Sequence, residues 1–171
     1  MLLIKSRLLL ALLLNPVWVL AQPQPTPKAA PMSDSSSPGL TQIRGRFEVR
    51  LDAQAASAAA AEAGLGRMSL FKQFHGALQG SSRGEMLAFR SATPGSAGYV
   101  AMETVVGSLD GREGSFVLQH SSTMARGEPH QSIEVVPDSG TGALAGLRGR
   151  MRIDIVNGEH FYVFDYALPE R

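Results

Sequence analysis

The feature that most constrains the fold is the Asp110-Gly111 pair. It lies between two runs rich in Val, Met, Phe and Leu, in the segment GSAGYVAMETVVGSLDGREGSFVLQHSSTMARG from 95 to 127. An Asp-Gly pair between alternating segments is among the strongest short-range signals for an antiparallel hairpin. With these two residues as the loop, Leu109 pairs with Arg112. One face of the hairpin, which we place in the interior, then carries Tyr99, Ala101, Glu103, Val105, Phe116, Leu118, His120 and Ser122.

A longer loop would not change these faces. A four-residue loop from Asp110 to Glu113 keeps the same residues together and sets Glu103 directly opposite His120. The other face is the alternative choice for the interior, and it holds Val100, Met102, Thr104 and Val117.

The Asn157-Gly158 pair predicts a second hairpin, because Asn-Gly is the preferred sequence of the type I′ turn. Val156 then pairs with Glu159. The outer face sets Arg150 opposite Asp165, an exposed ion pair that we expect to stabilise the fold by less than ~1 kcal/mol. The inner face is largely apolar and carries Gly149, Met151, Ile153, Ile155, His160, Tyr162, Phe164 and Tyr166.

The preceding segments also read as strands. From 42 to 52, apolar residues alternate with charged ones, which indicates a half-buried strand. Residues 53–64 favour a helix by propensity but are too few to hold one alone, so they predict a connection. The strand from 66 to 79 is predicted to carry a bulge near Lys72, and Gly80-Ser81-Ser82 separates it from the next. Further strands are expected at 81–92, 131–136, 148–156 and 159–168. Eight short strands predict an all-β fold, either an eight-stranded antiparallel β-barrel or a sandwich, and closing the sheet removes its exposed edges.

The first 40 residues predict a leader and a tether. A basic region precedes an apolar run, and Val19-Leu20-Ala21 suits signal peptidase, so we expect cleavage after Ala21. An uncleaved anchor is the alternative, although Asn15-Pro16 interrupts the run well before the roughly 20 apolar residues that span a bilayer. Residues 22–40 are rich in Pro, Ser and Gln, which predicts disorder. We expect a signal peptide over 1–21, this linker over 22–40, and one barrel domain over 41–171, exported to the periplasm or secreted.

Composition excludes several classes of function. The 171 residues are 44% hydrophobic and 18% charged, which fits one domain with a real core. Removing the leader leaves 14 of the 16 basic residues against 15 acidic ones, so no excess charge attracts nucleic acid or an anionic membrane surface. The chain has no Cys, which excludes disulfides, thiolate metal sites and a Cys nucleophile. We therefore expect no nucleic-acid partner, no membrane association after leader cleavage and no cofactor.

Three further patterns carry little chemistry. The run SGTGALAGLRG from 139 to 149 imitates a dinucleotide fingerprint, but that motif needs a βαβ unit, so we interpret its glycines as a tight corner. The histidines lack the i, i+2 or i, i+4 spacing of metal ligands, so we expect no metal site. Ser115, Ser121, Ser122 and Thr123 lie in no nucleophile motif such as GxSxG, so they give hydrolysis no support. The four histidines are His75, His120, His130 and His160.

The same segments support a family resemblance. The segment from 95 to 127, followed by VVPDSGTGALAGLRGRMRIDI and FYVFDYAL, closely resembles a widespread bacterial family of domains of unknown function, over residues 44–168. The chain's ending is also similar to allene oxide cyclase and dirigent proteins: Gly140-Thr141-Gly142, then Gly146 and Gly149, precede a strand pair that ends in aromatics. This resemblance implies an eight-stranded antiparallel barrel of the allene oxide cyclase-like, calycin-like kind, with an interior ligand cavity. It implies no activity, because one fold hosts unrelated chemistries.

The barrel interior is the candidate site. A carboxylate inside an apolar barrel is costly to ionise unless a partner satisfies it, and perturbed groups in cavities are where acid/base chemistry or ligand recognition is found. A satisfied network that fixes strand register, or a Glu103 that points to solvent, is the alternative. The residues that could converge there and bind a ligand are Tyr99, Glu103, His120, His160, Tyr162 and Tyr166.

Three functions remain open at this point. The favoured one is an exported barrel that binds a small apolar or phenolic molecule without changing it. A cofactor-independent isomerase or cyclase would need the same pocket, with Glu103 as acid/base and His120 or Tyr162 orienting the substrate. A structural or partner-binding barrel would have a filled core. The sequence does not decide among them, nor does it give the ligand or the oligomeric state.

Overall fold

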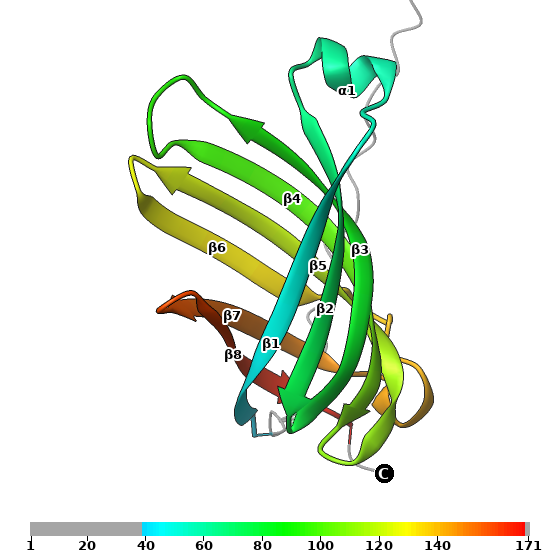
Figure 1. The fold of residues 1–171 in the computed structure, drawn as a ribbon. Helices are drawn as coiled ribbons and strands as arrows, with labels where there is room; N and C mark the ends of the chain where they lie inside the picture. The colour runs from blue at the N-terminus through cyan, green and yellow to red at the C-terminus, as the bar shows by residue number, and fades with distance from the viewer. Residues whose placement is uncertain (1–38, 170–171) are drawn as a thin grey trace, which may run out of the picture. The chain divides into compact units, whose positions relative to one another are not determined.

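Eight antiparallel strands pair in chain order and close into a barrel, with β8 returning to β1 (Figure 1). The fold is described by a computed structural model over residues 39–169. The all-β, eight-stranded antiparallel barrel predicted from the sequence is confirmed. The strands are β1 (Thr41–Gln54), β2 (Gly66–Gly76), β3 (Leu78–Arg90), β4 (Ala97–Leu109), β5 (Arg112–Ala125), β6 (Glu128–Val135), β7 (Arg148–Val156) and β8 (Glu159–Ala167).

Helical structure is confined to short connections in the described part of the chain. The predicted connection after β1 contains α1 (Ala58–Glu62), which begins where the Ser57 hydroxyl accepts a hydrogen bond from the Ala60 N–H. The glycine-rich corner before β7 contains a single 3-10 turn, η1 (Gly142–Leu144). None of the described helices is long and apolar enough to cross a membrane. The predicted signal peptide and nearly all of the predicted linker lie outside the described residues.

The two hairpin turns form as predicted. Asp110-Gly111 and Asn157-Gly158 all have positive φ angles, between 47° and 83°, as the type I′ turn requires. The residues that flank each turn pair with one another, so both loops have two residues. Glu103 consequently lies opposite Leu118, and His120 is its diagonal neighbour on the same inner face.

The bulge predicted near Lys72 is wrong. The register of β2 is uninterrupted against both β1 and β3. The turn between β2 and β3 lies at Ala77, so Gly80-Ser81-Ser82 is part of β3 and not a break. The side chain of Lys72 therefore points into the barrel with the alternate residues around it, Met68, Leu70 and Phe74.

Arg150 and Asp165 lie opposite each other as predicted, but the ion pair predicted between them is wrong. Arg150 lies between two strands, and its Nη2 is 3.1 Å from Glu134 Oε1 on β6. Asp165 accepts a hydrogen bond from Gln42 Nε2 on β1, at 2.7 Å. Both partners come from strands that the barrel order brings alongside the hairpin, and this order is not visible in the hairpin sequence alone.

The interior is filled by side chains at one end of the barrel only. At the other end a smaller group, Leu70, Met86 and Ala101, packs against the wall. The filled end carries the large aromatic and aliphatic residues, including Phe47, Phe74, Leu78, Leu109, Phe116, Leu118, Ile133, Tyr162, Phe164 and Tyr166.

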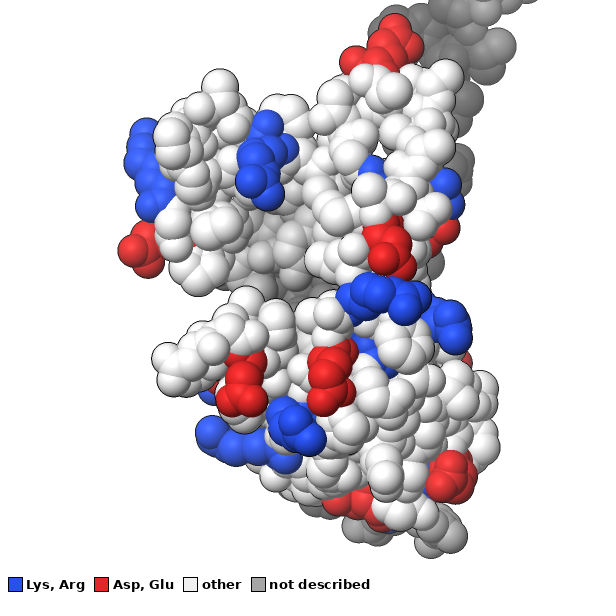
Figure 2. All heavy atoms as spheres, viewed as in Figure 1, with Lys and Arg blue, Asp and Glu red and all other residues white. Residues whose placement is uncertain are grey.

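Among the neighbouring strands of the barrel, β6 and β7 have the fewest paired residues. These strands pair at two positions only, Ile133 with Met151 and Glu134 with Arg150, and beyond them the tip of the β7–β8 hairpin diverges (Figure 1). The divergence leaves Ile155, which the sequence placed in the interior, 65% exposed. The space-filling view from the same side is hollowed between this hairpin and the strands above it, and charges of both signs are scattered around the hollow (Figure 2).

Candidate functional site

A buried polar cluster crosses the barrel between its filled and open ends. Glu103 Oε1 accepts hydrogen bonds from Lys72 Nζ at 2.6 Å and from His120 Nε2 at 2.7 Å. The hydroxyl of Ser82 donates to the other carboxylate oxygen, Oε2. All four residues are at most 5% exposed. The carboxylate is therefore bound through both oxygens and has no contact with solvent.

Small residues on β3 allow this cluster to form. Lys72 on β2 must reach across β3 to Glu103 on β4, and the residues that it passes are Ser82, its own cross-strand partner, and Gly84, the partner of Glu103. A Cβ atom on Gly84 would lie 2.7 Å from the Cβ of Glu103. The glycine thus allows the backbone of β4 at Glu103 to lie close against β3.

The electrostatics of the cluster favour a charged pair. Burial raises the pKa of Glu103, but the hydrogen bond from His120 and the charge of Lys72 outweigh it and bring the pKa down to about 2. The ammonium of Lys72 also lies 5.3 Å and 5.9 Å from the ring centroids of Phe47 and Phe74, which favours a cation at that point. An ionised carboxylate only accepts hydrogen bonds, so His120 donates through its Nε2–H.

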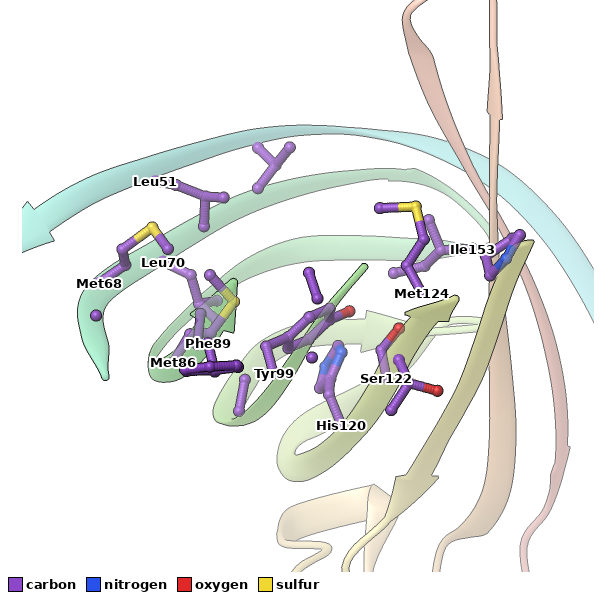
Figure 3. Close-up of a pocket in the computed structure, with 18 of the residues that line it drawn as sticks. Leu51, Met68, Leu70, Met86, Phe89, Tyr99, His120, Ser122, Met124 and Ile153 are labelled. Atoms are coloured by element: carbon purple, nitrogen blue, oxygen red, sulfur yellow. The ribbon is translucent and has the colours of Figure 1, made fainter. Parts of the chain in front are cut away.

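A cavity of about 760 Å³ occupies the open end, and the polar cluster forms its floor. Lys72 and His120 line it, whereas Glu103 lies beneath them and does not. Tyr99, Met124 and Ile153 approach the cavity from three different strands (Figure 3). The apolar part of the lining also includes Val49, Leu51, Met68, Leu70, Met86, Ala88, Phe89 and Ala101.

One side-chain amide spans the opening between β6 and β7. Gln131 Nε2 donates to the carbonyl oxygen of Ile153 at 2.9 Å, and Gln131 Oε1 accepts from the Ile153 N–H at 2.9 Å. The amide thus makes the two hydrogen bonds that a backbone ladder would otherwise make where the strands part. The amide therefore links β6 to β7 beyond the two positions at which their backbones pair.

Three of the six predicted site residues line the cavity: Tyr99, His120 and His160. Burial raises the pKa of Tyr99 above its ordinary value, and the opposing effect of the Ser122 hydroxyl is smaller. His160 is held against the ring of Phe47, at 5.3 Å between centroids. His120 thus belongs to the floor of the cavity, and Tyr99 and His160 line its wall.

The two other predicted tyrosines lie in the filled end and do not line the cavity. The hydroxyl of Tyr162 accepts from Leu78 N at 3.1 Å and donates to the carbonyl oxygen of His75 at 3.1 Å. The hydroxyl of Tyr166 donates to Asp110 Oδ2 at 2.5 Å, and burial together with this carboxylate raises the pKa of Tyr166 to about 12. Both hydroxyls are engaged in hydrogen bonds to other segments of the barrel, so we leave the two tyrosines out of the candidate site.

Sequence reasoning missed Lys72 and Ser82. The available signal was the alternation around Lys72, which places it in phase with apolar neighbours on β2 and therefore on the inner face. Its partner carboxylate is 31 residues away on a strand that is not adjacent to β2, so no local sequence pattern predicts the ion pair. Within the described residues no group of three or more His, Asp or Glu is placed to hold a metal ion.

Comparison with known proteins identifies a family and similar solved structures. Residues 43–166 match the model of a family described as "Protein of unknown function (DUF3224)". The crystal structure of a DUF3224 protein of unknown function from Shewanella oneidensis MR-1 is similar, with a TM-score of 0.73 and 49% sequence identity. The match covers 77% of this chain and 99% of that one. No curated protein matches the chain.

Proposed function

We propose that this chain, which belongs to the DUF3224 family of proteins of unknown function, binds a small and largely apolar molecule inside its barrel. The observation that carries the proposal is the cavity of about 760 Å³ with a mainly apolar lining. Ligand sites are usually cavities of ~300–1,000 Å³ in which a few polar groups orient the ligand. The likeness of the chain's ending to allene oxide cyclase and dirigent proteins, which implies an interior ligand cavity, supports the same reading.

The floor of the cavity suggests which polar group the ligand carries. Lys72 and Glu103 balance each other's charge, so the floor has little net charge to attract a strongly ionic ligand. His120 and Lys72 both line the cavity and carry nitrogen atoms that can meet an oxygen of the ligand. A ligand with an apolar or phenolic body and one oxygen-bearing end fits this arrangement, with Tyr99 along its side.

Nothing in the geometry favours the alternative, a cofactor-independent isomerase or cyclase that uses Glu103. A general acid or base works best with a pKa near the operating pH. Glu103 has a pKa of about 2, is bound through both oxygens and does not line the cavity. We therefore assign the carboxylate the role of holding Lys72 and His120 in position.

A cavity-filling variant tests the proposal. Ala88→Trp places a large ring into the cavity that Ala88 lines, whereas Val100→Trp, at a position 55% exposed, adds the same ring outside it. We expect the apolar dye N-phenyl-1-naphthylamine to bind the wild type and Val100→Trp equally. Binding to Ala88→Trp should be at least about tenfold weaker, a loss of ~1.4 kcal/mol. Equal binding by both variants would mean that the dye does not report on the cavity, and no saturable binding by the wild type would contradict the proposal.

We also propose that the chain is exported and acts outside the cytoplasm. The support is the sequence pattern at 1–21 and the Pro/Ser-rich stretch that follows it. Intact-mass measurement of the protein recovered from the periplasm or the medium tests this proposal. We expect a chain that begins at Gln22, and a mass that retains residues 1–21 would contradict cleavage.

A further inference from the structure

We propose that Lys72 captures the carbonyl group of an aldehyde or ketone ligand as a protonated imine. The ligand class of the cavity would then be an apolar carbonyl compound. This inference deepens the proposed function and rests on it, because the ligand must first enter the cavity. Its own support comes from the type of residue at position 72, from the position of the amine, and from Glu103, which would pair with the iminium as it pairs with the ammonium.

The choice of residue is the first observation. Residues 39–169 contain eleven arginines and a single lysine, Lys72. Within this part of the chain the exposed basic positions are therefore all arginine, and the one buried basic residue is lysine. Arginine is the better partner for a buried carboxylate, because its planar group binds both oxygens, whereas only the amine of lysine condenses with a carbonyl group. A purely structural ion pair would not require this choice.

The position of the amine is the second observation. Lys72 lines the cavity although its side chain is only 7% exposed, so a ligand in the cavity reaches it while bulk water has little access. The Nζ atom is bonded to Glu103 Oε1 at 2.6 Å, and His120 Nε2 is bonded to the same oxygen at 2.7 Å. The carboxylate thus holds the amine in place at the edge of the apolar cavity.

The chemistry balances without a further reactant. Lys72 gives one proton to a water molecule in the cavity, and the neutral amine forms a C–N bond to the carbonyl carbon. The carbonyl oxygen takes one proton from the amine nitrogen, which gives a carbinolamine. The hydronium ion returns its proton to the carbinolamine hydroxyl, and this group leaves as water with its bonding electron pair while the C=N double bond forms. An ammonium and a carbonyl compound become an iminium and water.

The product suits the site that the ammonium occupied. The iminium keeps the positive charge of Lys72 and one N–H, so Glu103 keeps a counterion and a hydrogen-bond donor. The rings of Phe47 and Phe74 face a cation before and after the reaction. The buried carboxylate thus has a cation beside it both before the reaction and in the product, and an unpaired carboxylate there would be costly.

Reductive trapping tests the inference. The purified chain is incubated with decanal and sodium cyanoborohydride, which reduces an imine to a stable secondary amine, and the labelled residues are located by peptide mapping. We expect Lys72 to be labelled more than Lys28 in the folded protein, and its labelling to fall to the level of Lys28 after unfolding in urea. Lys28 and the N-terminal amine serve as internal references for non-specific labelling, so this measurement needs no variant. Labelling of Lys72 no greater than that of Lys28 would overturn the inference.

Decan-1-ol and the variant Lys72→Arg separate the two proposals. The alcohol has the same apolar chain but cannot form an imine, and arginine keeps the charge but not the amine. We expect both ligands to displace the dye from the wild type, decanal alone to leave an adduct at position 72, and no adduct at that position in Lys72→Arg. Displacement by both ligands without an adduct at Lys72 overturns the imine and leaves the proposed function standing. Displacement by neither contradicts both.

Discussion

Breaking the ion pair at the floor of the cavity should cost several kcal/mol of folding free energy. Glu103→Gln leaves the ammonium of Lys72 buried without a counterion, a type of change that costs ~3–5 kcal/mol. The pKa gives an independent figure: lowering it from 4.5 to about 2 makes the folded protein with ionised Glu103 more stable by roughly 3 kcal/mol, at about 1.4 kcal/mol per pH unit. Lys72→Met should cost a similar amount, because it removes the charge that faces the carboxylate.

The double variant Lys72→Met/Glu103→Gln separates the pair from its parts. Because it removes both charges together, it should lose at least ~2 kcal/mol less than the sum of the two single losses. Urea unfolding followed by far-ultraviolet circular dichroism measures all four proteins. The matched control is the exposed pair of Arg150 and Glu134, whose side chains are 75% and 50% exposed. The corresponding cycle with Arg150→Met and Glu134→Gln should show a coupling below ~1 kcal/mol.

The pH dependence supplies a second check on the same reasoning. The pKa of Glu103 is lower in the folded protein than the ordinary value of 4.5, so its contribution is fully present above pH 4.5 and is lost as the pH falls toward 2. The stability difference between the wild type and Glu103→Gln should therefore shrink by roughly 2 kcal/mol between pH 7 and pH 3. Single-variant losses below ~1 kcal/mol, or a difference that does not change with pH, would refute the assignment of Glu103 as a buried, paired carboxylate.

Three further predictions concern the opening between β6 and β7 and the filled end of the barrel. Gln131→Ala should remove the bridge across the β6–β7 opening and speed both binding and release of the dye in stopped-flow measurements, and unchanged rates would mean that the ligand enters elsewhere. Gly45→Ala should destabilise the fold by ~1–3 kcal/mol in urea unfolding, because its Cβ would lie 2.4 Å from the hydroxyl of Tyr162; full stability would contradict this close approach. Tyr166→Phe leaves Asp110 Oδ2 without its donor and should cost ~1–2 kcal/mol of stability with dye affinity unchanged; a change in dye affinity would return this tyrosine to the site.

The sequence predicts much of the fold because two turns settle the faces of four strands. Once Asp110-Gly111 and Asn157-Gly158 are fixed as two-residue loops, a period of two assigns each residue of the flanking strands to one side of the sheet. Glu103 and His120 reach the interior by this argument, as the structure has them. The prediction extends only as far as the hairpins, since each face is defined relative to its own turn.

The parts that the sequence did not predict depend on contacts between strands that are distant in the chain. Lys72 meets Glu103 across an intervening strand, and Arg150 chooses Glu134 over Asp165 because the barrel places β6 beside β7. The bulge predicted near Lys72 rests on treating Met68 and Leu70 as out of phase with Phe74, whereas these residues share one phase of β2 with Lys72. Alternation fixes the face of a residue, but the order of strands around the barrel decides what it meets there.

The buried ion pair is better understood as part of a binding site than as a device for stability. An eight-stranded barrel is wide enough either to be filled by side chains or to hold one small ligand, and this barrel does each at one end. Apolar residues of similar volume often stabilise a core as well as a buried ion pair does or better, and the filled end shows that this chain can supply them. The polar cluster of Lys72, Ser82, Glu103 and His120 lies where the aromatic filling ends and the cavity begins. Lys72 and His120 line that cavity, while Glu103 holds them in position. The free energy that the fold gives up by having this cluster in place of apolar residues is explained if a ligand binds these two side chains.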